Sequence, residues 1–99
     1  MAEHAAVIDV SRYYSAPGKR DELLSAMKEM AGQAAASEGC FGATACASDQ
    51  DGEALIAISR WESQSALDAF ANSPGFVRER ERMTSLLAKP AHREHFRPA

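Results

Sequence analysis

Cysteine, clustered positive charge and long apolar runs are all scarce in this sequence, and each scarcity excludes a class of protein. Cys40 and Cys46 are too few for a disulfide framework and lack the paired spacing of a zinc site, so we expect both to be small buried hydrophobic residues. The chain has 11 Lys and Arg residues against 14 Asp and Glu, a formal net charge of -3. This balance argues against a nucleic-acid partner, because phosphates are bound by clustered cations.

Signals for export and for membrane insertion are missing as well. Residues 1–10 lack a basic region, a long apolar core and a small-residue cleavage site. No apolar run approaches the roughly 20 residues that span a bilayer. We therefore expect a cytoplasmic protein with no membrane partner.

The chain length of 99 residues fits one domain, residues 1–99, and leaves no room for a second hydrophobic core. At this size folding buries only roughly 60 to 70 % of the surface of the unfolded chain, so a second subunit would add usefully to stability. Hydrophobic residues make up 45 % of the chain, but many of them are alanine, which buries little area. The few large apolar side chains must therefore form the core or a site.

The first half of the chain reads as strand, helix, strand, strand. Residues 7–14 are rich in β-branched and aromatic types and predict a strand, and apolar residues at three- and four-residue steps predict an amphipathic helix over residues 19–36. Gly39 suits the left-handed turn that ends many helices. The polar cluster at residues 48–52 then predicts an antiparallel hairpin between residues 40–47 and residues 53–61.

The second strand of that hairpin is polar on neither of its faces. Leu55 and Trp61 share one face, and Ile56 and Ile58 share the other. Helices can cover one face of the sheet, but a chain this short needs a second subunit to cover the other. We therefore expect a homodimer.

The second half of the chain predicts two helical segments and a last strand. Ser63 is a good N-cap for a short helix, residues 72–75 interrupt it, and another helix begins after Pro74. Residues 92–97 predict an edge strand or a strand exchanged between subunits. The order β-α-β-β-α-β is the ferredoxin-like arrangement, an α+β fold with helices on one face of a four-stranded antiparallel sheet.

Several motifs resemble those of the antibiotic biosynthesis monooxygenase family, a branch of the dimeric α/β-barrel proteins. Together they span nearly the whole chain. They are YSAPGKRDEL at residues 14–23, EGCFG at 38–42, RWES at 60–63, Ala66, AF at 69–70 and SPGF at 73–76.

The resemblance implies a dimeric α/β barrel and, as activity, a monooxygenase that needs no cofactor. Its partners would be molecular oxygen and a phenolic, quinol-like or polyketide-type aromatic substrate. The family also contains haem-degrading enzymes and members without a known substrate. A second hypothesis is therefore a non-catalytic small-molecule-binding or stress-associated protein of the same fold.

The resemblance points to Trp61 as the most recognisable position, where a large ring with one N–H donor can line an aromatic pocket and orient a substrate oxygen. A buried core tryptophan is the alternative. Phe70 and Phe76 have the same two interpretations, as pocket walls or as core residues on the apolar faces of helices. Met83 falls near the face that carries Phe76 and joins them as a substrate-binding candidate.

Polar candidates come from the first strand and from the last helix. Ser11, Arg12 and Tyr14 can hydrogen-bond or deprotonate a phenol, and so can Arg80 or Arg82. We therefore expect Trp61, Ser11 and Arg80 to be catalytic and Tyr14, Phe70, Phe76 and Met83 to bind the substrate.

Haem and metal chemistry are disfavoured by the residues at the decisive positions. Where the haem-degrading branch carries an asparagine on the first strand and a histidine on the last helix, this chain has Ser11 and Glu79 or Arg80. His92 and His95 are three apart on a strand and should point to opposite faces, so they cannot chelate one ion. Ala57 stands nearest to the asparagine that some quinone-forming members use. We therefore expect neither a metal nor a cofactor.

Overall fold

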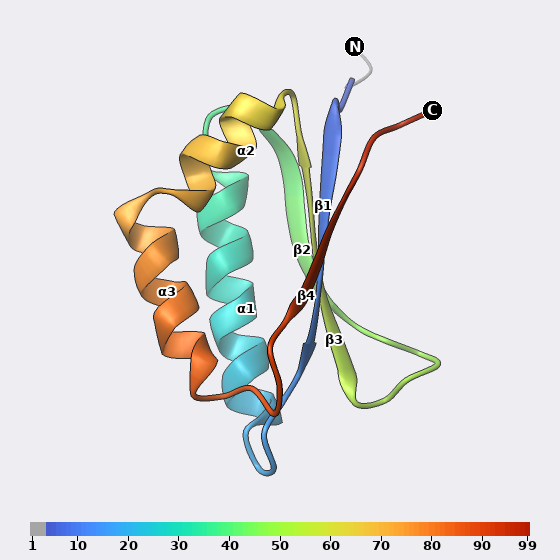
Figure 1. Cartoon of the computed structure of the whole chain (residues 1–99), viewed down its shortest axis with the longest axis vertical. Helices are drawn as coiled ribbons and strands as arrows, with labels where there is room; N and C mark the ends of the chain where they lie inside the picture. Colours follow the sequence, from blue (N-terminus) through green and yellow to red (C-terminus); the bar gives the residue numbers. More distant parts are fainter. Residues whose placement is uncertain (1–3) are drawn as a thin grey trace.

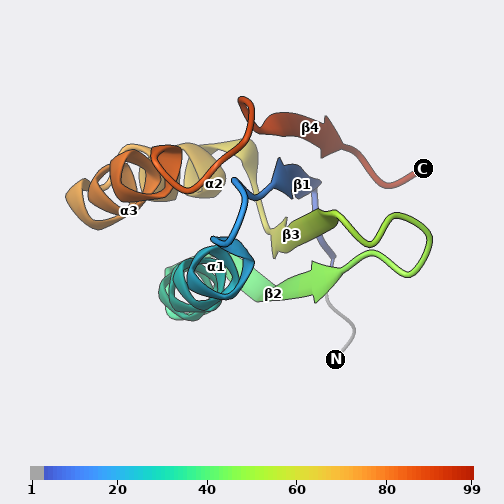
Figure 2. The same cartoon turned by 90° about the horizontal axis from the view of Figure 1, so that it is seen from below.

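The computed structural model describes residues 4–99 and confirms the α+β, ferredoxin-like fold with its four-stranded antiparallel sheet. Figures 1 and 2 show the helices gathered on one face of the sheet. The elements are β1 (Val7–Tyr14), α1 (Arg20–Ala35), β2 (Cys40–Ala47), β3 (Ala54–Trp61), α2 (Gln64–Ala71), α3 (Pro74–Thr84) and β4 (His92–Phe96).

The strand order is β2-β3-β1-β4, so β1 and β3 are the interior strands. In β1, Ser11 pairs with Ala57 of β3 on one side and with Arg93 of β4 on the other. Because side chains alternate between the faces of a strand, the odd-numbered residues of β1 lie on the helix side and the even-numbered ones on the open side. This alternation decides which polar groups reach the space under the helices.

Two serines start the helices of the second half. The Ser63 hydroxyl accepts a hydrogen bond from the Ala66 backbone N–H at 3.0 Å, and the Ser73 hydroxyl accepts one from Phe76 N–H at 3.4 Å. Pro74 follows Ser73 in the first turn of α3, where its missing N–H removes no helical bond. The helical segment is therefore interrupted between α2 and α3, and α3 lies alongside α1 (Figure 1).

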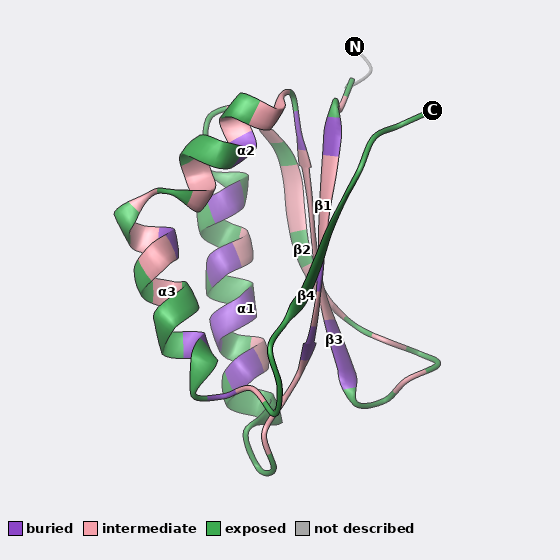
Figure 3. Cartoon of the chain, viewed as in Figure 1, coloured by how far each residue is buried: buried purple, intermediate pink, exposed green. Residues whose placement is uncertain are grey.

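The core is the layer between the helices and the sheet, as the buried face of α1 shows in Figure 3. One cluster gathers Leu23, Met27, Leu55 and Met83, and a second gathers Trp61 with three smaller neighbours at the α2 end. All five residues of β4 are exposed. The core is therefore closed around β1 and β3 and thin at the β4 edge.

The structure shifts some sequence-based bounds and corrects one expectation. The helix expected over 19–36 and the strands expected over 53–61 and 92–97 each differ from the observed element by one residue at one or both ends. Cys40 and Cys46 are half-buried rather than buried, because both lie on β2, an edge strand of the sheet. Residues 1–3, which begin the expected domain and the amino-terminal stretch considered above, lie outside the described residues.

A bilayer-spanning helix is not found in the part of the chain that the structure describes, since none of its helices is both long and apolar enough.

Candidate functional site

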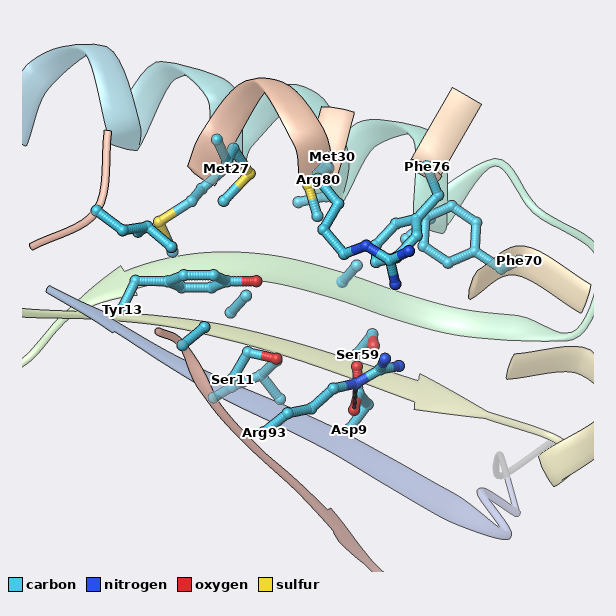
Figure 4. Close-up of a pocket in the computed structure, with 18 of the residues that line it drawn as sticks. Asp9, Ser11, Tyr13, Met27, Met30, Ser59, Phe70, Phe76, Arg80 and Arg93 are labelled. Carbon is cyan, nitrogen blue, oxygen red and sulfur yellow. Dashed lines mark hydrogen bonds and ion pairs between the residues drawn. The ribbon is translucent and has the colours of Figure 1, made fainter. Parts of the chain in front are cut away.

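A cavity of about 550 Å³ lies between the sheet and the helices (Figure 4). All four strands, the three helices and the segment from Leu87 to Ala91 contribute to its lining. The volume falls in the range of roughly 300 to 1,000 Å³ that small-molecule sites occupy. The cavity is the candidate site.

The helices supply an apolar roof. Met27 and Met30 come from α1, Phe70 from α2, and Phe76 and Met83 from α3. The Phe70 and Phe76 rings pack with their centroids 4.9 Å apart and their planes tilted by 58°. Aromatic faces and polarizable thioethers form a surface that suits a flat, apolar ligand.

The sheet supplies a polar floor. Asp9, Ser11 and Tyr13 line the cavity from alternate positions of β1, with Ser59 from β3 and Arg93 from β4 beside them. Figure 4 shows the Tyr13 hydroxyl and the Ser11 hydroxyl on the cavity side of the sheet. A ligand lying between roof and floor would meet rings on one side and hydrogen-bonding groups on the other.

Asp9 links β1 to β4 at one end of this floor. Its Oδ1 atom accepts a hydrogen bond from Arg93 Nε at 2.8 Å and lies 3.0 Å from His95 Nε2. The Asp9 side chain is 14 % exposed, so the carboxylate is largely shielded from water. Shielding strengthens its interaction with the guanidinium compared with an exposed pair.

Tyr13 places a buried phenol in the floor of the cavity. Burial raises the pKa of the Tyr13 phenol, and the nearby Asp9 charge also raises it. The hydrogen bond with Ser11 and the Arg93 charge lower that pKa, but burial is the largest effect. At neutral pH the phenol is therefore protonated and can donate a hydrogen bond into the cavity.

Five of the residues singled out in the sequence come together at the cavity: Ser11, Arg80, Phe70, Phe76 and Met83. Ser11 is 5 % exposed and is the buried polar residue of the described chain. In Figure 4 the Arg80 side chain extends from α3 toward the sheet, at the end of the cavity where Asp9 and Arg93 lie.

Trp61 and Tyr14 are not among the lining residues. Trp61 is fully buried behind the lining: its Nε1–H donates to the Ser59 hydroxyl at 2.8 Å, and its ring centroid lies 5.4 Å from that of Phe70. The Tyr14 hydroxyl donates to Asp51 at 3.1 Å. Tyr14 therefore fastens the β2–β3 turn to β1.

Sequence reasoning missed four polar residues of the floor: Asp9, Tyr13, Ser59 and Arg93. The signal for two of them was present in β1, where Asp9, Ser11 and Tyr13 share the face that also carries the buried Val7. Polar residues on the buried face of an interior strand are unusual and mark a site. Arg93 gave no such signal, because the pairing of β4 with β1 cannot be read from a short polar segment.

Metal and haem ligands are not assembled at this site. No cluster of three His, Cys, Asp or Glu side chains suited to a metal ion occurs within residues 4–99. Histidine is likewise not among the described side chains that line the cavity, so an iron-ligating imidazole has no candidate there. His95 contacts Asp9, whereas His92 lies 3.7 Å from Glu94.

Comparison with known proteins identifies a family whose sequence profile matches most of this chain. The sequence profile described as antibiotic biosynthesis monooxygenase matches residues 6–82. No curated protein matches the chain significantly.

Solved structures share the fold along almost the whole chain. Rv0793 from Mycobacterium tuberculosis is 25 % identical with a TM-score of 0.88, over 96 % of each chain. PA3566 from Pseudomonas aeruginosa is 17 % identical with a TM-score of 0.85, over 100 % of this chain and 99 % of that one. A mutant of SnoaB, a cofactor-independent oxygenase from Streptomyces nogalater, is 19 % identical with a TM-score of 0.82, over 95 % and 93 %.

Proposed function

We propose, because the chain belongs to the antibiotic biosynthesis monooxygenase family, that it is a monooxygenase that works without a cofactor on a phenolic or quinol-like aromatic small molecule. The observation that carries the proposal is the cavity, with its aromatic and thioether roof and its polar floor. SnoaB, which shares the fold, is a cofactor-independent oxygenase. An aromatic substrate can supply the electrons for such a reaction itself.

The proposed reaction converts a phenol and one molecule of oxygen into a quinone and one molecule of water. The phenol first loses its proton, and a ring carbon then gives an electron pair to oxygen and forms a C–O bond. The resulting hydroperoxide loses water as its O–O bond breaks and the ring carbon becomes a carbonyl. Atoms and electrons balance with no further oxidant or reductant.

The floor supplies the polar groups for this sequence. Ser11 and the protonated Tyr13 donate hydrogen bonds to the phenolate oxygen, and Asp9 accepts the substrate proton. Arg80 adds positive charge at the end of the cavity where Asp9 lies. Trp61 acts as a positioning residue, since its N–H fixes the Ser59 hydroxyl.

The roof holds the ring. Phe70 and Phe76 stack on the substrate and Met83 fills the remaining space, which keeps bulk water from the reacting carbon. Oxygen is small and apolar and can enter the same space.

Oxygen uptake tests the proposal. Purified protein is supplied with phenols and hydroquinones of one to three fused rings, and oxygen consumption and quinone absorbance are recorded together. We expect one oxygen consumed per quinone formed, and we expect Ser11→Ala to slow the reaction about tenfold because one hydrogen bond to the developing charge is lost. Ser65→Ala, on the exposed surface of α2, is the matched control. Uptake that is the same with heat-denatured protein would sink the proposal.

A non-catalytic binding protein is the second candidate, and one observation favours it. Ala57 lies on the cavity floor and offers only a methyl group where the resemblance associates an asparagine with quinone formation. A binding protein would take up aromatic ligands with no oxygen consumption for any phenol. Ligand binding without turnover across the whole panel would move this candidate to first place.

The working unit is proposed to be a homodimer. The open face of the sheet carries Ile8, Val10 and Ile56, which the register places away from the helices. Phe96 adds a ring that is 44 % exposed beside Ile8. Arg12 and Arg60 lie on the same face, and the apolar patch among them is stabilised when a second copy covers it.

A further inference from the structure

The charges at the cavity differ in sign from those of the chain as a whole. The chain has 11 basic and 14 acidic residues, yet the charged residues that line the cavity are the cations Arg80, Lys89 and Arg93 and the single carboxylate Asp9. Asp9 is already bound to Arg93. The lining therefore keeps a surplus of positive charge inside an acidic protein.

Arg80 is the lining cation that is available to bind an anion. Its guanidinium carbon lies 5.6 Å from the centroid of the Phe76 ring, and no carboxylate lies within ion-pair distance of it among residues 4–99. The neighbouring Arg82 on the same helix is different, because it pairs with Glu29 and Glu79 at 3.3 Å each. Arg80 thus presents an uncompensated charge at the cavity, held against an aromatic ring of the roof.

The other two lining cations, Lys89 and Arg93, differ in how far their charged groups already contact other side chains. The Lys89 ammonium lies 4.1 Å from the centroid of the Tyr14 ring, outside the polar floor. Arg93 gives its Nε–H to Asp9, which leaves the outer N–H groups of its guanidinium without a partner among the described residues. Arg80 from α3 and Arg93 from β4 lie at the same end of the cavity in Figure 4.

We infer that the substrate carries an oxyanion, a carboxylate or a phosphate, on its aromatic framework, and that Arg80 binds this group with Arg93 beside it. A planar guanidinium matches an oxyanion with paired hydrogen bonds, and the Phe76 ring lies beside the Arg80 guanidinium, with its centroid 5.6 Å from the guanidinium carbon. The aromatic part of the substrate then lies against Phe70 and Phe76. This inference rests on the proposed function only in taking the cavity as the substrate site.

Binding of three probes of equal ring size tests the inference without any turnover. Isothermal titration calorimetry compares 2-naphthoate, 2-naphthyl phosphate and the neutral 2-naphthamide at low and moderate salt. We expect at least one anion to bind about tenfold more tightly than the amide, because a charge-assisted hydrogen bond is lost in the neutral probe. Whichever anion binds more tightly identifies the carboxylate or the phosphate as the group recognised.

Arg80→Gln is expected to reduce the preference for the anion to about twofold or less and to leave the affinity for the amide unchanged. Arg78→Gln is the matched control, because Arg78 is exposed on the same helix and does not line the cavity. Arg80 is itself exposed, so its replacement leaves the fold intact.

Equal binding of all three probes, no binding of any, or equal effects of the two arginine variants would overturn the inference. The proposed oxygenation fails separately, by an absence of oxygen uptake with every phenol of the panel, whether or not an anion is preferred.

Discussion

At the scale of single residues, Tyr13 is the side chain whose protonation the fold controls. Burial raises the pKa of its phenol, so the folded protein keeps the proton at pH values where the unfolded chain begins to lose it. The stabilisation is complete below the unfolded pKa of about 10 and is lost as the pH rises through the raised folded pKa.

The prediction is that the free energy of unfolding falls more steeply between about pH 9 and pH 11 in the wild type than in Tyr13→Phe. Phenylalanine fills the same space and has no proton to lose. Urea denaturation at each pH measures the slope. Parallel curves for wild type and Tyr13→Phe would mean that Tyr13 is not held in its neutral form.

Trp61 combines packing with one hydrogen bond, and two substitutions separate these roles. Trp61→Ala empties a fully buried position and should lower the free energy of unfolding by about 3 to 5 kcal/mol. Trp61→Phe keeps an aromatic ring beside Phe70 but removes the donor to the Ser59 hydroxyl. We expect it to remain folded and to slow oxygenation severalfold.

A double-mutant cycle checks that this slowing runs through Ser59. Trp61→Phe combined with Ser59→Ala should cost little more activity than either change alone, because both remove the same hydrogen bond. Additive losses in oxygen uptake would show that the indole acts on the substrate by another route.

At the scale of elements, α2 depends on its N-cap. The Ser63 hydroxyl accepts the Ala66 N–H at 3.0 Å, and alanine would leave that donor without its partner. Ser63→Ala should lower the free energy of unfolding by about 1 kcal/mol, measured by urea denaturation. Ser65→Ala, two residues on and exposed, should be neutral or slightly stabilising because alanine has the higher helix propensity. Equal losses for the two variants would contradict a capping role for Ser63.

The connection between α1 and β2 depends on Gly39. Its φ of +83° favours glycine, and a Cβ at this position would lie 2.6 Å from the Ala66 Cβ. Gly39→Ala therefore combines backbone strain with a steric clash against α2, and should cost about 2 to 4 kcal/mol.

Gly18 provides the control for backbone strain alone. Its φ is +75°, but a Cβ there meets nothing within 4 Å, so Gly18→Ala should cost only about 1 kcal/mol. Thermal unfolding of both variants separates the cost of backbone strain from the cost of the clash with Ala66. If Gly39→Ala lowered the stability no more than Gly18→Ala, the close contact between α2 and this connection would be contradicted.

At the scale of the whole molecule, the fold was predictable because its elements are marked locally. The Ser63 cap, the polar turn at residues 48–52 and the Gly39 break fixed element ends to within one residue of the observed ones. Local signals of this kind survive tertiary packing, since each rests on backbone groups that must be satisfied nearby.

The candidate site was predictable only in part, because a cavity joins residues far apart in the chain. The family resemblance indicated Phe70, and the helical periodicity indicated Met83. Both residues line the cavity. The resemblance also indicated Trp61. Whether this residue lines the cavity depends on the orientation of its side chain at the end of β3, which the sequence does not specify. Arg93 was missed because its contact with Asp9 at 2.8 Å depends on the pairing of the first and last strands.

The open face of the sheet carries the last prediction. In the described chain no helix covers it, and Val10 lies at its centre, paired with Ile58 of β3 and Glu94 of β4. If a second copy covers this face, the protein should sediment at twice its chain mass of 10.7 kDa at micromolar concentration.

A buried carboxylate at such an interface would cost several kcal/mol per subunit, so Val10→Asp should sediment as a monomer. Ser65→Asp adds the same charge on the exposed surface of α2 and should stay dimeric. Because β4 is exposed and borders both this face and the cavity, the monomeric variant should also lose rigidity around Arg93 and bind aromatic anions less tightly. A wild-type protein that sediments at 10.7 kDa would show instead that the apolar open face is stable in water without a partner.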